Sequence, residues 1–356
     1  MKFSTLTILF ALALALAPRA AARQQPPRPG PGKGEPAAEE FALEQHTETE
    51  ARAVVSLCLN EGDLIVRGWD RNEVRARAEG EGTLRLLTPN VRPAPRVEVL
   101  VSEERDAVLG PGRCGSNQTI ELTVPRGASV ELEARSGHVE VADVAQARIK
   151  VLSGDVDVRR VSRGVEVSCL SGDVSVSDST GPVRVDTVSG DVEARNLRTA
   201  AAGDEFEVKS ASGDVTIEGV GHSNVSGSAV SGSLLYTGAL ARGGSYDFRT
   251  ISGDVTLELP DSSSFSLHAK VVIGGEIVTD FPVKTVGVPV TPVRMPPAPP
   301  APPDPGEAVP PAPPRKGQKG RPPREHESAR LDGTVGSGDA VVNLSSFSGS
   351  LHLRKR

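Results

Sequence analysis

The chain has 356 residues, a formal net charge of −6 and an aromatic content of only 3%. Nucleic-acid binding relies on basic patches and stacking rings, and the repeated part of this sequence lacks both, so no nucleic-acid partner is expected. The scarcity of aromatic residues also disfavours a sugar-binding or glycosidase cleft.

The first element in chain order is a secretory signal peptide, which we expect at residues 1–22. Lys2 precedes an apolar run, and Ala20-Ala21-Ala22 provides an A-x-A cleavage site. Residues 23–40 are rich in Pro, Gly, Gln and Glu, and we expect them to form a disordered linker. These features predict an exported protein, periplasmic or extracellular, with no membrane span in the mature chain.

Residues 41–135 alternate like strands and are expected to form an N-terminal β capping region. Three cysteines in an exported chain leave an odd count. Cys58 lies in a strand-like segment and Cys114 in a glycine-rich loop, so a disulfide between them is a candidate pairing in an oxidising compartment. Cys169 is interpreted as a small buried residue of the repeats that follow.

The most regular feature of the chain is a Ser-Gly-Asp or Ser-Gly-Ser tripeptide that is followed each time by an apolar residue. Successive copies start 18 to 23 residues apart, and a period of this length is typical of a solenoid, in which each unit packs against its neighbours. The copies begin at Ser153, Ser171, Ser189, Ser212, Ser231 and Ser252, with degenerate ones at Ser136 and Ser348.

Each repeat reads as two short strands joined at a bend. Apolar residues alternate with polar ones up to the Ser-Gly pair, where the phase slips by one residue and the alternation resumes. Residues 136–288 therefore predict an all-β domain, a repetitive β-solenoid of stacked two-strand rungs; a β-sandwich of hairpins is the alternative. The expected inward columns contain Val151, Cys169 and Thr187, and Val156, Val174 and Val192.

A proline-rich insert separates this repeat domain from the end of the chain. Residues 289–328 hold about half of the 29 prolines and are expected to be extended and disordered. Their basic second half is interpreted as a solvated linker, or alternatively as a docking segment for an anionic envelope polymer. Residues 329–356 return to the strand pattern, and we expect them to form the closing β rung, the last of the solenoid.

The sequence resembles a bacterial domain-of-unknown-function family described as putative adhesin, or β-strand-repeat-containing. The resemblance covers roughly residues 50 to 288 and 328 to 356. It is carried by the Val-Ser-Gly-Asp-Val units and by Asn60–Val74, which is similar to an opening hairpin, Leu122–Ala128, Thr279–Val283 and Leu331–Gly336. The label "adhesin" is itself an inference from shape, so the resemblance implies the repeat fold and little chemistry.

Candidate chemical sites are few, and no catalytic residue or cofactor site is expected. The six histidines are scattered without metal-ligand spacing, and we interpret them as surface or loop residues. One charged column recurs with the repeat and consists of Asp155, Asp173, Asp191, Asp214 and Asp254. Stacked carboxylates could attract calcium, but we favour the interpretation that they cap their turns, and we expect calcium to matter little for folding.

A second recurring column is apolar. The residue before each Ser-Gly should face outward by alternation, yet the column contains Leu152, Leu170, Val188, Ala211, Val230 and Ile251. Either the bend turns these side chains into the core, which we favour, or they form an exposed stripe of the kind that marks an interface.

Taken together, these patterns predict a non-catalytic, exported β-repeat protein that acts as an envelope scaffold or adhesin-like binding module. Its partner would be an unknown envelope protein or polymer. Two alternatives stay open: a polysaccharide-acting β-helix enzyme, and an envelope-stress sensor that contacts a partner protein through the proline insert.

Overall fold

The computed structural model describes residues 43–80, 82–102, 114–115, 118–285 and 328–356, which all fall in one compact unit. These residues form 26 strands and no helix, so the predicted all-β class is confirmed. Among them there is also no helix that is long and apolar enough to cross a membrane. The expected signal peptide and nearly all of the proline-rich insert lie outside the described residues.

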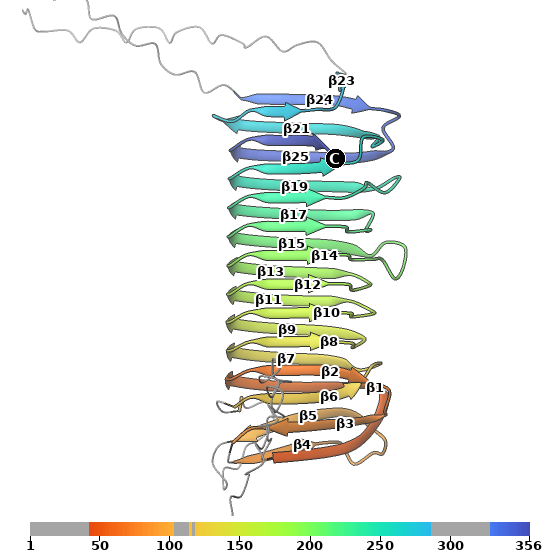
Figure 1. Cartoon of the computed structure of the whole chain (residues 1–356), viewed down its shortest axis with the longest axis vertical. Helices are drawn as coiled ribbons and strands as arrows, with labels where there is room; N and C mark the ends of the chain where they lie inside the picture. Colours follow the sequence, from red (N-terminus) through yellow and green to blue (C-terminus); the bar gives the residue numbers. More distant parts are fainter. Residues whose placement is uncertain (1–42, 81, 103–113, 116–117, 286–327) are drawn as a thin grey trace, which may run out of the picture. The chain divides into compact units, whose positions relative to one another are not determined.

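The strands form two sheets of stacked rungs (Figure 1), in which each rung contributes one strand to each sheet. Sheet 1 holds the strands before the bend, in the spatial order β4 (Thr83–Leu87), β5 (Ala94–Ser102), β1 (Leu43–Glu61), β7 (Ser129–Ser136), β9 (Gln146–Ser153), β11 (Val165–Ser171), β13 (Val183–Ser189), β15 (Glu205–Ser212), β17 (Asn224–Ser231), β19 (Ser245–Ser252), β25 (Ala340–Ser348), β21 (Phe265–Ile273), β24 (Ala329–Val335) and β23 (Lys284–Thr285).

Sheet 2 holds the strands after the bend, and six of its twelve strands are only four residues long. Their spatial order is β3 (Glu73–Ala78), β6 (Ile120–Pro125), β2 (Leu64–Trp69), β8 (Val139–Ala142), β10 (Val156–Arg159), β12 (Val174–Ser177), β14 (Val192–Arg195), β16 (Val215–Glu218), β18 (Leu234–Thr237), β20 (Val255–Leu259), β26 (Leu351–Lys355) and β22 (Ile277–Thr279). Strand β1 links the two sheets, because its first residues pair with β3.

Neighbouring rungs pair in parallel and in register, and this places equivalent residues in columns. Val156 of β10 faces Val174 of β12, which faces Val192 of β14. All three are buried, as are Val151, Cys169 and Thr187 of the other predicted inward column. The phase slip at the bend is therefore confirmed: both strands of a rung turn their apolar face into the space between the sheets.

The bend requires glycine because successive rungs approach each other there through the backbone. Gly172 has φ +135°, and a Cβ atom built on it would overlap the carbonyl oxygen of Gly154 in the neighbouring rung. The same overlap recurs at every bend from Gly137 to Gly349, so the glycines form a continuous ladder. Any side chain here would have to adopt a disfavoured conformation and also push two rungs apart.

The C-terminal segment does not form the last rung, so this expectation was wrong. Strands β25 and β26 lie between the rung of β19 and β20 and the rung of β21 and β22. Strand β24 then adds to the outer side of β21 in antiparallel orientation. The apolar pattern of residues 340–355 fits any interior rung equally well, so the sequence pattern alone did not fix its place.

The N-terminal end differs from expectation in a similar way. The stretch from Asn60 to Val74 resembled an opening hairpin, but β1 and β2 form a rung whose bend is Glu61-Gly62-Asp63 and whose neighbours are β7 and β8, in parallel. The stack of rungs therefore starts near residue 54, inside the region that was expected to be a cap. Strands β5 and β6 pair with β1 and β2 in the same parallel manner.

Candidate functional site

The candidate site is a row of exposed apolar side chains on the outer face of sheet 1, next to the bends. We define the apolar stripe as the penultimate residue of eight consecutive pre-bend strands: Leu152, Leu170, Val188, Ala211, Val230, Ile251, Phe347 and Val272. Of the nine exposed large apolar residues in the described part of the chain, six belong to this stripe.

Exposure decides between the two interpretations of this column. The five large side chains that the sequence pattern placed in this column expose 48–53% of their surface: Leu152, Leu170, Val188, Val230 and Ile251. Phe347, the sixth large side chain of the apolar stripe, exposes 49%. The expectation that the bend turns these residues into the core was therefore wrong. Strand alternation continues up to the serine of each Ser-Gly pair, so the residue before it still points outward.

A groove runs along the part of the apolar stripe between Leu152 and Val230, with a volume of about 790 Å³. One wall of this groove is the column of outward residues two positions earlier in each strand, which includes Lys150, Ser168, Asp186 and Lys209. The apolar side chains are thus bordered by polar groups and not covered by larger neighbours.

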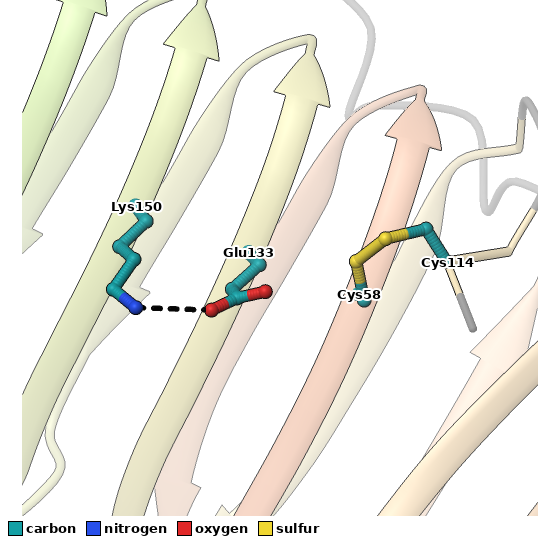
Figure 2. Close-up of a disulfide and its surroundings, with 4 residues drawn as sticks. All are labelled: Cys58, Cys114, Glu133 and Lys150. Atoms are coloured by element: carbon teal, nitrogen blue, oxygen red, sulfur yellow. Dashed lines mark hydrogen bonds and ion pairs between the residues drawn. A yellow bond between two sulfur atoms is a disulfide. The ribbon is translucent and has the colours of Figure 1, made fainter. Parts of the chain in front are cut away.

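Cys58 and Cys114 form a disulfide (Figure 2). Both cysteines line the N-terminal end of the groove. Cys58 lies in register with Glu133 and Lys150 on the outer face of sheet 1, and the Lys150 Nζ atom is 3.2 Å from Glu133 Oε1. Gly115 adds two backbone hydrogen bonds to β1, of 2.8 and 2.9 Å. The disulfide and these hydrogen bonds therefore fix Cys114 and Gly115 to β1.

The third cysteine lies beneath the apolar stripe and is unlike the other two. The Cys169 side chain is buried, and its Sγ atom lies 3.7 Å from the carbonyl oxygens of Gly154 and Gly172. Burial raises the pKa of the Cys169 thiol, so this group stays protonated and unreactive near neutral pH. It is a packing residue and not a nucleophile.

The aspartate column lies on the other side of the bends, and its carboxylates are engaged within the stack. The Asp155 carboxylate accepts a hydrogen bond of 2.9 Å from the backbone N–H of Asp173, and the Asp173 carboxylate accepts one of 2.8 Å from the N–H of Asp191. Asp191, Asp214 and Asp254 make equivalent bonds to the next rung in space. Each aspartate therefore binds the bend of its neighbour, and the bonds that the structure shows are not to its own turn, contrary to the capping interpretation.

Metal binding finds no support at these carboxylates. Within the described residues, no group of three or more His, Cys, Asp or Glu side chains is arranged to hold a metal ion. One histidine departs from expectation: His222 is fully buried, with Nε2 2.9 Å from the carbonyl oxygen of Gly181 and its ring packed on Phe206. It fills the turn between β16 and β17 and has no ligand-binding neighbours that would make it a site.

Sequence reasoning missed two members of the apolar stripe, Phe347 and Val272. Phe347 belongs to the C-terminal rung and lies between Ile251 and Val272 in the stack, since Ser348 is in register with both Ser252 and Ile273. The signal was present for Phe347, because it too precedes a Ser-Gly pair. Val272 precedes Ile273-Gly274-Gly275, where that signal is absent.

Two crystal structures of proteins described as adhesins align with this chain. A crystal structure of a putative cell adhesion protein from Clostridium sporogenes aligns over 88% of this chain and 99% of its own, with 10% identity and a TM-score of 0.22. A crystal structure of a putative adhesin from Bacteroides fragilis aligns over 62% of this chain and 90% of its own, with 13% identity and a TM-score of 0.34.

No curated protein matches the chain. The family model described as Toastrack DUF4097 matches residues 55–282, which is more than half of the chain. This range starts at the first rung and ends just after β22, so it contains the aspartate column and most of the glycine ladder and of the apolar stripe. The chain belongs to the Toastrack DUF4097 family.

Proposed function

We propose that the protein is an exported, non-catalytic binding module of the cell envelope, and that the apolar stripe is its contact surface. The observation that carries this proposal is the exposure of six large apolar side chains in one straight row. Contiguous apolar surface of this kind normally marks an interaction site, because it is unfavourable to leave it in water.

The enzyme alternative is less well supported. A β-helix enzyme would need free carboxylates that converge on a groove, whereas the aspartates that recur here accept backbone hydrogen bonds from the next rung. Besides aliphatic and small residues, the groove along the apolar stripe is lined by charged side chains such as Glu133, which is paired with Lys150, and Asp186, and its cysteine thiol is kept protonated. The sensor alternative is compatible with the proposal, because a sensor also needs a contact surface.

The test is a pull-down from envelope extract with the purified protein as bait. The double variant Leu170→Glu/Val188→Glu places two charges in the middle of the apolar stripe. The matched control is Val341→Glu, which changes an equally exposed valine at the opposite end of a sheet 1 strand. We expect the wild type and the control to retain the same envelope component and the double variant to lose it.

A second arm of this experiment removes residues 289–324 and joins the ends with a short Gly-Ser linker. If the insert is a passive linker, this variant retains the component that the wild type retains. Retention by the double variant, or loss in the control, would contradict the assignment of the apolar stripe as the contact surface.

A further inference from the structure

We propose that the apolar stripe binds the same stripe of a second copy of this chain, so that two solenoids pack with their stacking axes antiparallel around a two-fold axis. This inference rests on the proposed function, because it names the partner of the same surface. Three features of the apolar stripe support it: its spacing, its area and the charges beside it.

The spacing favours a second copy over an unrelated partner. Side chains in the apolar stripe follow one another at the distance between hydrogen-bonded strands, about 4.8 Å, over eight rungs. A second stripe has the same spacing, so the side chains of one copy can fit between those of the other along the entire row. A surface with another period would match at only a few positions.

The area is sufficient for a dimer. Six side chains that each expose about half of their surface present on the order of 600 Å² per copy, and stable specific interfaces bury roughly 1,200–2,000 Å² in total. The apolar stripe alone therefore reaches the lower end of this range, and the polar column beside it adds to the buried area.

The charges beside the apolar stripe select the antiparallel arrangement. With the two-fold axis between Ala211 and Val230, Val188 of one copy faces Ile251 of the other. The outward residues two positions earlier then bring Asp186 opposite Arg249 of the second copy, twice by symmetry. Arg249 is already paired with Asp247 of its own strand at 2.7 Å, so Asp186 would join this pair as a second carboxylate. The lysines at the ends of the row face each other, but Lys150 is already paired with Glu133. In a parallel arrangement the two-fold axis runs along the stack and reverses the strand direction, so the charged columns of the two copies lie on opposite sides of the apolar stripe and Asp186 does not meet Arg249.

The first experiment measures the molar mass of the purified protein in solution by light scattering and sedimentation over a range of concentrations. We expect a dimer for the wild type and for Val341→Glu, and a monomer for Leu170→Glu/Val188→Glu at concentrations where the control is dimeric. Urea unfolding of both variants checks that each is folded. A wild type that is monomeric at every concentration would overturn the inference.

The second experiment tests the geometry with single cysteines and a short bismaleimide. Ala211→Cys lies next to the two-fold axis, so the two thiols of a dimer should be cross-linked. Leu152→Cys lies at one end of the row, where the two copies of this residue are seven rungs or roughly 34 Å apart, and it should give no cross-linked dimer. Cross-linking through Leu152→Cys would show a parallel dimer and reject the proposed arrangement.

The third experiment exchanges the charges. Asp186→Arg should raise the dimer dissociation constant about tenfold, and Asp186→Arg/Arg249→Asp should restore it, because the exchanged pair meets again across the interface. The outcomes distinguish the two proposals. A monomeric wild type that still retains an envelope component through the apolar stripe leaves the proposed function intact and overturns the dimer. If the wild type is a dimer, the component it retains from the extract is a second copy of this chain. Retention of the same component by Leu170→Glu/Val188→Glu contradicts the proposed function alone.

Discussion

The two columns beside the bends, aspartate on one side and apolar on the other, recur with the same period but differ in what they contact. The carboxylate of Asp173 binds the backbone N–H of Asp191 in the next rung, so its recurrence follows from the needs of the stack. Leu170, by contrast, points into solvent and exposes half of its surface. Recurrence along a solenoid therefore indicates function only where the repeated side chain has no role within the stack.

The largest expected effect comes from breaking the bend that the two columns share. Gly172→Ala should lower the free energy of unfolding by about 4 kcal/mol, since its Cβ atom would overlap the carbonyl oxygen of Gly154 and its φ is +135°. Urea unfolding followed by circular dichroism measures this loss.

Gly203→Ala is the matched control for that substitution. Gly203 also has a positive φ, +95°, but a Cβ atom there would meet nothing within 4 Å. Its cost should be only about 1–2 kcal/mol, the strain of the backbone alone. Equal losses at Gly172 and Gly203 would show that contact between rungs does not explain the glycine ladder.

A smaller effect is expected when the aspartate column is interrupted. Asp173→Ala should cost about 1 kcal/mol, because the N–H of Asp191 loses its acceptor at a site that water can still reach. Asp173→Asn keeps an acceptor oxygen at the same position, so the free energy of unfolding should stay close to that of the wild type. The prediction fails if the two variants are equally destabilised.

Interruption of the apolar column should leave the stability of the isolated chain nearly unchanged. Leu170→Ser removes an exposed side chain, and the change in the free energy of unfolding should stay within about 0.5 kcal/mol. The measurement must be made at low protein concentration, because association through the apolar stripe would add to the apparent stability of the wild type. A loss of 2 kcal/mol or more would mean that Leu170 contributes to the stack after all.

The smallest effect is expected from calcium. The thermal midpoint of the protein should be the same with calcium and with a chelator, because the carboxylates of the aspartate column are already hydrogen-bonded to neighbouring rungs. An increase of several degrees with calcium would show that these carboxylates bind the ion in the native state, because such binding stabilises a protein by mass action.

The repeat fold was predictable because the two patterns that produce it, alternation within each strand and the phase slip at each bend, can both be read from short stretches of the sequence. Alternating valines define each strand, and the phase slip at Ser-Gly defines the bend, so Val167 and Val174 could both be placed in the core. The spatial order of the rungs was not predictable for residues 340–355. Their pattern suits any interior position, and the choice depends on contacts with β20 and β21 that are distant in the chain.

The residues of the candidate site were predictable from the sequence, but their exposure to solvent was not. Alternation assigned Leu170 and Val188 to the outer face, and only their apolar character led us to expect burial. The role of Asp173 was also only partly foreseen, since its hydrogen-bond partner belongs to the following rung and can be identified only once the register is known. Both the exposure of Leu170 and the partner of Asp173 depend on which residues of the neighbouring rungs lie next to them, and this is known only from the register.

The interior position of the C-terminal rung has a consequence for how the chain matures. Strands β21 and β22 are synthesised before β25 and β26, yet they reach their final neighbours only after the last residues of the chain have been inserted beside them. A chain that stops early would present two unpaired sheet edges, at β20 and at β21, and such edges promote aggregation. The fold thus makes synthesis through residue 355 a condition for a closed stack, so that products truncated before β25 remain distinguishable from folded ones to any protease that recognises open strands.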